Sequence, residues 1–283
     1  MSIQTQEGDT STYLFLMGIN PERPIQLAEN LTIEPVTCYP NPDDMIGVIM
    51  NQEIGSCRET DLGILISTMR QTTAQLLIKG VNANQLAVHA WNAQSDVTLL
   101  SALTGKEIYW HIQSNKGADE FSKDSYINIV VNTRMYIPQS TSLIKEAECT
   151  WLENNFSIAA RLMDEKRFYT AVNSLWAYRM NPNPFVQMAV LWAGIESLVG
   201  AGSYELSYRI STITALFLDT GAEGRNSIKK LYNARSKAVH EGHIKDIRDV
   251  NKSAALLRDL LLKCIEVVDL PNEEKLMFGY AAK

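Results

Sequence analysis

Residues 231–242 read LYNARSKAVHEG, and this stretch decides the interpretation of the C-terminal half of the chain. Its apolar residues continue the spacing set by Ile228, which is that of one face of an α-helix. Arg235 falls in the middle of this face, and Gly242 is placed to end the helix. A buried guanidinium without a partner is costly, so Arg235 requires a carboxylate or an open, wet cleft. The predicted stripe consists of Ile228, Leu231, Tyr232, Ala238 and Val239.

Glu196 is a second charged residue that needs a partner. It lies in QMAVLWAGIESLVG (187–200) and has almost only apolar neighbours. A buried ion pair between Glu196 and either Arg235 or Arg209 would satisfy both charges. This structural explanation leaves out His240, five residues after Arg235. At about 100° per residue the two side chains point roughly 140° apart on one helix. Either His240 lies in a fraying last turn, or two copies of the helix form the site across a symmetric interface.

The composition is that of an ordinary folded protein. The chain has 283 residues, of which 46% are hydrophobic and 20% charged, so it can form one large domain or two of usual size. It contains no apolar run long enough for a membrane span and no N-terminal signal pattern. The scattered cysteines indicate reduced thiols, and we expect a cytoplasmic protein. These cysteines are Cys38, Cys57, Cys149 and Cys264.

The net charge of −6 is unevenly distributed. Residues 1–150 carry 9 Lys and Arg against 17 Asp and Glu, whereas residues 151–283 carry 17 against 15. An acidic protein does not by itself indicate nucleic-acid binding, because phosphate contacts need clustered cations. One such cluster surrounds Arg235, and it is either a solvated helix face or a binding surface. It comprises Arg225, Lys229, Lys230, Arg235 and Lys237.

The pattern of residues 1–140 predicts a β-rich, acidic N-terminal domain, with one helix near 61–79. Short apolar runs alternate with turn-forming clusters, which is typical of strands in a sheet. His89 and His111 fall in two of these runs and are expected to be structural. The runs are TYLFLMGI, LTIEPVT, MIGVIM, LGILIST, QLAVHAW, EIYWHIQ and YINIVVNTRMYIP.

Residues 141–283 have helical periodicity and predict an all-α domain, which makes the fold class α+β. Ser142 is placed to cap a first helix to about residue 164, with Leu143, Ala147, Trp151, Phe156 and Ala160 as its stripe. Pro184 suits the first turn of another helix, which ends near Gly200. The further helices are predicted over 167–180, 204–218, 224–241 and from 247 to before Pro271.

The segment ARSKAVHEG resembles the R-x4–6-H signature of HEPN domains, in the Arg-Ser-x-x-x-His form of the Apea-like HEPN family. LWAGIESLVG is similar to that family's helix with a buried glutamate, and ELSYRISTITALFL to the helix after it. Together these segments cover about 185–242 in the family's order. Glu241 stands where a glycine often follows the histidine directly.

This resemblance implies a metal-independent endoribonuclease that is active as a homodimer. Histidine titrates near neutral pH, so His240 would transfer protons, and Arg235 would stabilise the charge on the phosphate. The expected products carry 2′,3′-cyclic phosphate and 5′-hydroxyl ends. Glu196 and Ser236 would support the site, and His243 is a further candidate imidazole. The residues expected to hold RNA are Lys229, Lys230, Lys237 and Tyr232.

Neither a metal nor a cofactor is expected. The sequence lacks metal-ligand spacing and both GxxxxGK[ST] and GxGxxG. The resemblance implies RNA as partner, a role in microbial stress or phage defence, and a regulatory or antitoxin-like protein partner. The alternative is a non-catalytic HEPN module that binds or scaffolds a partner protein or nucleic acid.

Overall fold

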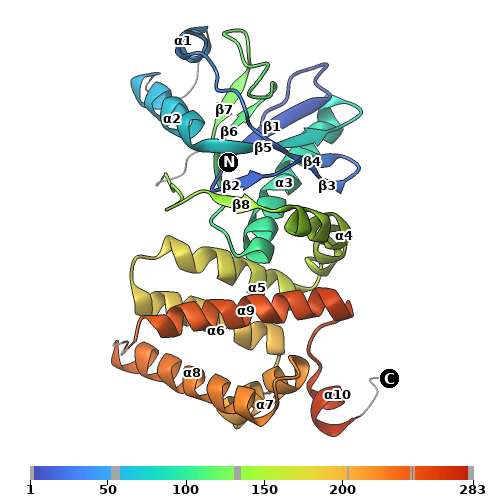
Figure 1. Ribbon diagram of the computed structural model, residues 1–283, viewed down its shortest axis with the longest axis vertical. Helices are drawn as coiled ribbons and strands as arrows, with labels where there is room; N and C mark the ends of the chain where they lie inside the picture. Colours follow the sequence, from blue (N-terminus) through green and yellow to red (C-terminus); the bar gives the residue numbers. More distant parts are fainter. Residues whose placement is uncertain are drawn as a thin grey trace. The chain divides into compact units, whose positions relative to one another are not determined.

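The computed structural model describes residues 3–51, 58–130, 135–202, 204–242, 244 and 246–279 (Figure 1). The chain divides into two compact units. The first comprises residues 1–101 and 106–157, and the second comprises 102–105 and 158–283. The second unit thus begins later than residue 141, because most of the helix predicted to open it packs with the first unit.

The first unit is built on an antiparallel sheet with the order β3–β4–β5–β1–β6–β7. Its central strand β1 pairs with β5 in the register Leu14↔Leu76 and with β6 in the register Leu14↔Gln113. A separate parallel pair joins β2 to β8. The bounds are β1 Ser11–Met17, β2 Ile19–Pro21, β3 Ile25–Ala28, β4 Leu31–Pro35, β5 Thr72–Lys79, β6 Tyr109–Ser114, β7 Ile127–Ile129 and β8 Ser142–Ile144.

Helices cover this sheet, and α1 and α2 lie together beside it (Figure 1). Phe15 of β1 packs into a cluster with Val48 of α1 and Met69 of α2. Leu14 and Leu16 point to the opposite face and are also fully buried, so neither face of β1 is open to water. The helices are α1 Pro42–Asn51, α2 Arg58–Gln71, α3 Ala83–Thr104 and α4 Glu146–Leu162.

The fold class α+β is confirmed, but several predicted strands of the N-terminal part are wrong. MIGVIM, LGILIST and QLAVHAW lie in α1, α2 and α3 respectively. The predicted helix near 61–79 splits into α2 and β5. Short apolar runs are compatible with both a buried strand and a buried helix, and here the helix forms. The first unit is therefore a mixed unit of sheet and helices and not simply β-rich.

Ser142 does not cap a helix. It begins β8, and its N–H donates to the carbonyl of Gly18 at 2.9 Å. Helix α4 starts only at Glu146, so its predicted stripe is displaced: Leu143 is 47% exposed and Trp151 is half-buried. The residues that α4 does bury are Cys149, Leu152, Phe156, Ala159 and Leu162.

The second unit is helical, and its helix bounds follow the predictions closely. Asn183 caps α6 by accepting from the Phe185 N–H at 3.2 Å, and Pro184 occupies the first turn. Gly200 and Gly242 end α6 and α8 at φ of 64° and 65°. The bounds are α5 Lys166–Ala177, the 3-10 turn η1 Tyr178–Met180, α6 Pro184–Val199, α7 Leu206–Phe217, α8 Gly221–Glu241, α9 Arg248–Val267 and α10 Glu273–Phe278.

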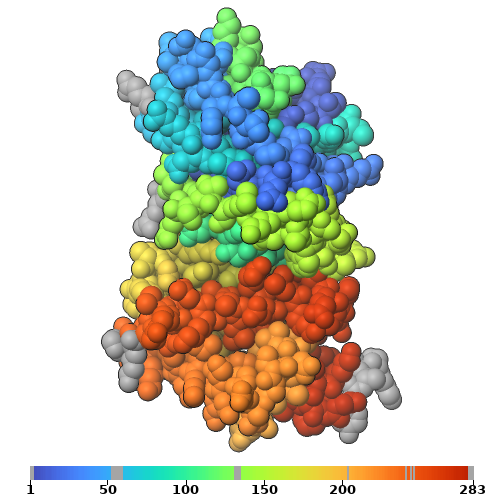
Figure 2. Space-filling model, viewed as in Figure 1, coloured from blue at the N-terminus to red at the C-terminus, as the bar shows by residue number. Residues whose placement is uncertain are grey.

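Helix α6 is the centre of this unit and packs against α5, α8 and α9. Trp192 and Ile195 of α6 are fully buried, and Gly194 lets α5 and α9 approach closely. Helices α8 and α9 contact each other and run side by side, as Figure 2 shows in orange and red. The short helix α10 was not predicted. Within the described ranges, no helix is both long and apolar enough to cross a membrane.

Candidate functional site

Arg235 lies on the side of α8 that faces the interior of the second unit. Ile228, Leu231 and Ala238 on this side are buried, as the spacing predicts. Tyr232 is half-buried, and Val239 is 42% exposed, so the predicted stripe is narrower than expected. Arg235 itself is half-buried and therefore needs the partner that the sequence demands.

That partner is Glu196 of α6. The Arg235 Nη2 atom lies 3.0 Å from the Glu196 Oε1 atom, and the two side chains are 22% and 24% exposed. The predicted pair is thus formed with Arg235. Arg209, the alternative, instead pairs with Glu273 of α10. Burial raises the pKa of the Glu196 carboxyl, and the charge of Arg235 opposes this shift only in part.

Two aromatic side chains hold Arg235 in place: Tyr232 packs against its guanidinium, and Trp192 packs against Tyr232. The Arg235 guanidinium carbon lies 5.7 Å from the centre of the Tyr232 ring, which is the range of a cation–π contact. Trp192 packs edge-on against Tyr232, with ring centres 5.3 Å apart at 86°. The Trp192 Nε1–H donates to the Ser253 Oγ at 3.0 Å, which fixes the indole. Tyr232, predicted to hold RNA, thus positions Arg235.

The ion pair leaves hydrogen-bonding capacity unused. Among the described residues, neither the Arg235 Nε nor the Glu196 Oε1 has a hydrogen-bond partner, although both atoms are buried. The 3.0 Å contact is therefore an ion pair without hydrogen-bond alignment. A guanidinium presents five N–H donors in a planar fork, and because the Nε–H of Arg235 is buried, an anionic group from outside would have to meet the terminal Nη groups.

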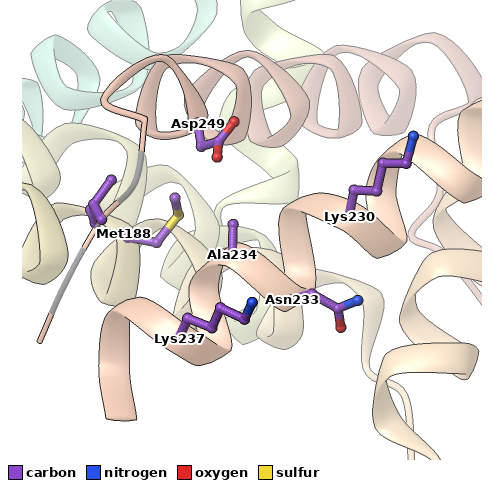
Figure 3. Close-up of a pocket in the computed structure, with 7 residues that line it drawn as sticks. Met188, Lys230, Asn233, Ala234, Lys237 and Asp249 are labelled. Atoms are coloured by element: carbon purple, nitrogen blue, oxygen red, sulfur yellow. The ribbon is translucent and has the colours of Figure 1, made fainter. Parts of the chain in front are cut away.

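The three predicted RNA-binding lysines are all exposed on α8, but they differ in surroundings. Lys230 and Lys237 line a pocket of about 220 Å³, whereas Lys229 does not. Ser236 is half-buried next to Arg235. The pocket lies between α6, α8 and α9, with Asp249 on the α9 side and Ala234 on the α8 side (Figure 3). Its walls are Met188, Lys230, Asn233, Ala234, Lys237, Ile244 and Asp249.

His240 belongs to the last turn of α8, two residues before the left-handed Gly242. Its side chain lies outside the part of the chain that the structure describes, and so does the whole of His243. The helix axis nevertheless sets the relation between positions. Position 240 is three residues after Lys237 and seven after Asn233, so it shares their side of α8 and not the side of Arg235.

The other two histidines, which we predicted to be structural, each lie against a backbone carbonyl. The Nδ1 of His89 lies 2.7 Å from the Lys79 carbonyl, and the Nε2 of His111 lies 2.8 Å from the Tyr136 carbonyl. Burial lowers the pKa of the His111 imidazole, and hydrogen bonds to the backbone of Tyr136 and Val130 oppose this shift. No group of three or more His, Cys, Asp or Glu residues suited to a metal ion occurs within the described ranges.

Sequence reasoning missed the pocket residues outside the basic cluster. Lys230, Asn233 and Lys237 follow an i, i+3, i+7 pattern, and this periodicity could have indicated a polar face of α8. Met188 and Asp249 carry no such signal, because they come from α6 and α9 and reach the pocket only through tertiary packing.

Comparison with known proteins gives no match: no protein-family model, no curated protein and no solved structure matches the chain.

Proposed function

We propose that this protein is a metal-independent endoribonuclease of the Apea-like HEPN type, with its active site at the C-terminal end of α8. Arg235 and His240 are the proposed catalytic residues, and the products would carry 2′,3′-cyclic phosphate and 5′-hydroxyl ends. The proposal rests on the resemblance of residues 185–242. The observation that supports it best is the fixed position of Arg235, a half-buried guanidinium that Glu196 and Tyr232 hold in place.

The residue types suit this reaction. In RNA cleavage without a metal, the 2′-hydroxyl attacks the neighbouring phosphate, and a group that titrates near neutral pH must take its proton. His240 is the candidate for this proton transfer. The transition state places additional negative charge on the phosphate oxygens, and the permanently charged Arg235 would stabilise it.

The site would be completed by a second copy of the chain. On one helix, positions 235 and 240 point roughly 140° apart, so they cannot both reach one phosphate. In a two-fold dimer, Arg235 of one copy and His240 of the other can meet in a shared cleft. Glu196, Tyr232 and Trp192 would then be positioning residues that hold the guanidinium toward the interface.

The acidic first unit would restrain or trigger the nuclease by sensing a signal or binding a regulatory protein. A nuclease that cleaves cellular RNA needs such control, and its setting would be the microbial cytoplasm during stress or phage infection. The net charge of −8 over residues 1–150 makes this unit unsuited to holding RNA itself.

A second candidate is a non-catalytic interaction module. One observation favours it: Arg235 has an ion-pair partner in Glu196 and an aromatic support in Tyr232, which together explain its presence by packing. A packing role requires no histidine at position 240, so substitution of His240 separates the two candidates.

The test is cleavage of a labelled RNA mixture in EDTA by the full chain, with the product ends identified. We expect Arg235→Ala and His240→Ala to lose at least about a hundredfold in rate. Arg225→Ala, an exposed arginine on the same helix, is the matched control and should retain activity. Cleavage that persists in both site variants would refute the assigned residues. A wild-type chain that is inert but binds a partner would favour the interaction module.

A further inference from the structure

The pocket between α6, α8 and α9 has the size and lining of a site for one ring system. Its volume of about 220 Å³ lies below the roughly 300–1,000 Å³ of sites for drug-sized ligands. Met188, Ala234 and Ile244 supply apolar walls, which suit a flat aromatic ring. Lys230, Asn233, Lys237 and Asp249 supply the polar groups.

The lysines favour an anionic substituent at the mouth of the pocket. Lys230 and Lys237 are both exposed, and within the described residues neither forms an ion pair. Figure 3 shows the Lys230 side chain pointing up from α8 and the Lys237 side chain running along this helix. A ring that fills the apolar part and carries a phosphate would meet both cations, and this combination describes a nucleotide.

Asp249 contributes a carboxylate to the pocket. It lies in the first turn of α9 and is half-buried. Its Oδ1 lies 3.3 Å from the Lys252 Nζ, and its Oδ2 has no hydrogen bond to another described residue. A carboxylate only accepts hydrogen bonds. Guanine offers it two adjacent donors, N1–H and the N2 amino group, whereas uracil offers one.

We propose that this pocket binds a guanine base of the substrate RNA, with Asp249 accepting from its donor edge and with Lys230 and Lys237 beside its phosphate. For its ligand class, this inference rests on the proposed ribonuclease function. The pocket would then give the nuclease a base preference close to the cleaved phosphate.

A continuous series of side-chain contacts connects the pocket to Arg235. The Ser253 hydroxyl donates to the Met188 Sδ at 3.3 Å and accepts from Trp192 at 3.0 Å. Trp192 packs on Tyr232, which lies under Arg235. Met188 at the pocket and the guanidinium are thus linked by continuous contacts. Position 240 also lies on the pocket side of α8, so a bound nucleotide would be near the proposed proton-transfer residue.

The first experiment measures binding without cleavage. Guanosine, adenosine and uridine 5′-monophosphates are titrated into the full chain by calorimetry. We expect the guanosine nucleotide to bind at least about tenfold more tightly than the uridine nucleotide, as for a bidentate base contact. Asp249→Asn should remove this preference, because an amide cannot accept at both atoms. Glu266→Gln, which also breaks an i,i+3 pair with a lysine on α9, is the control.

The lysines are tested separately from the base. Lys230→Gln and Lys237→Gln should weaken all three nucleotides alike and reduce the salt dependence of binding. Lys166→Gln, at an exposed lysine of α5 outside the pocket, should change neither. Because these exposed residues tolerate substitution, they test the proposal even if Asp249→Asn does not fold, which circular dichroism would reveal.

The outcomes separate this inference from the proposed function. Equal binding of the three nucleotides by the wild type, or a preference that survives Asp249→Asn, would overturn the guanine pocket. RNA cleavage without preference for guanosine would leave the ribonuclease standing and remove the pocket. Guanosine-nucleotide binding by a chain that cleaves no RNA would support the pocket and refute the ribonuclease.

Discussion

At the scale of single residues, the cost of burying the Glu196 carboxylate outweighs its attraction to Arg235. Burial raises the pKa of Glu196 even though Arg235 is 3.0 Å away. The ionised carboxylate is therefore less favourable in the folded protein than in the unfolded chain. Partly buried pairs often cost more in desolvation than they gain in attraction. We infer that Glu196 is there to hold the guanidinium in place.

The substitution Glu196→Gln tests whether the ionised Glu196 carboxylate lowers the stability of the fold. The pKa of Glu196 is higher in the folded protein than its value of 4.5 in the unfolded chain. The protonated carboxyl therefore stabilises the fold fully at pH values below 4.5, and this contribution is lost as the pH rises through the folded-state pKa. Glutamine resembles the protonated carboxyl and lacks this loss. We therefore expect Glu196→Gln to unfold in urea at an equal or higher concentration than wild type at pH 7. Near pH 4 the difference should vanish.

The same variant should cleave RNA more slowly, by at least about tenfold, because the arginine would lose its fixed position. Glu266→Gln, at an exposed glutamate of α9, is the control for both measurements. A clear loss of stability at pH 7 in Glu196→Gln would show that the pair stabilises the fold, and the positioning role would then lose its support.

At the scale of elements, helix ends could be predicted from the sequence wherever a residue fixes the backbone. Pro184 and Gly200 mark the ends of α6, and Gly242 ends α8, because proline suits the first turn and glycine the left-handed cap. MIGVIM and QLAVHAW have no such marker. Over so few positions, their apolar residues fit both the helical period of about 3.6 residues and the strand period of about 2. Their helical state therefore depends on packing against the sheet.

The glycine caps offer a matched pair of substitutions. Gly242 and Gly279 end α8 and α10 at φ of 65° and 70°, and a β-carbon at either would meet no atom within 4 Å. Alanine at either position costs only backbone strain, about 1–2 kcal/mol. We expect Gly242→Ala to lower the RNA cleavage rate, because it loosens the turn that holds His240. Gly279→Ala should leave the rate unchanged, and equal rates in both variants would contradict the role of this turn.

The close packing of α5 and α9 around Gly194 of α6 leads to a second prediction at this scale. A β-carbon there would lie 2.6 Å from the Ser174 Cβ and 2.9 Å from the Leu257 Cδ2. Overpacking should outweigh the helix propensity of alanine, so Gly194→Ala should destabilise the protein by about 1–2 kcal/mol in urea unfolding. Gly63→Ala in α2 has open space around it and should instead stabilise the protein by about 0.5–1 kcal/mol.

At the scale of the whole molecule, the α+β class and the helical second unit follow from the change in periodicity along the chain. The Glu196–Arg235 pair was also predictable, because two buried charges of opposite sign need each other. The pocket was not, since its walls come from helices whose packing the sequence pattern does not specify. The division of α4 between the units was missed for the same reason.

The proposed two-fold site can be tested by mixing variants, because it combines Arg235 of one chain with His240 of another. Arg235→Ala keeps His240, and His240→Ala keeps Arg235, so each variant alone should be inactive. By symmetry a wild-type dimer has two pairs of Arg235 from one chain with His240 from the other, and a mixed dimer of the two variants keeps one of them. With random exchange between equal amounts, about a quarter of the wild-type RNA cleavage should return. A site formed within one chain predicts no recovery, so mixing the two inactive variants determines which arrangement the protein uses.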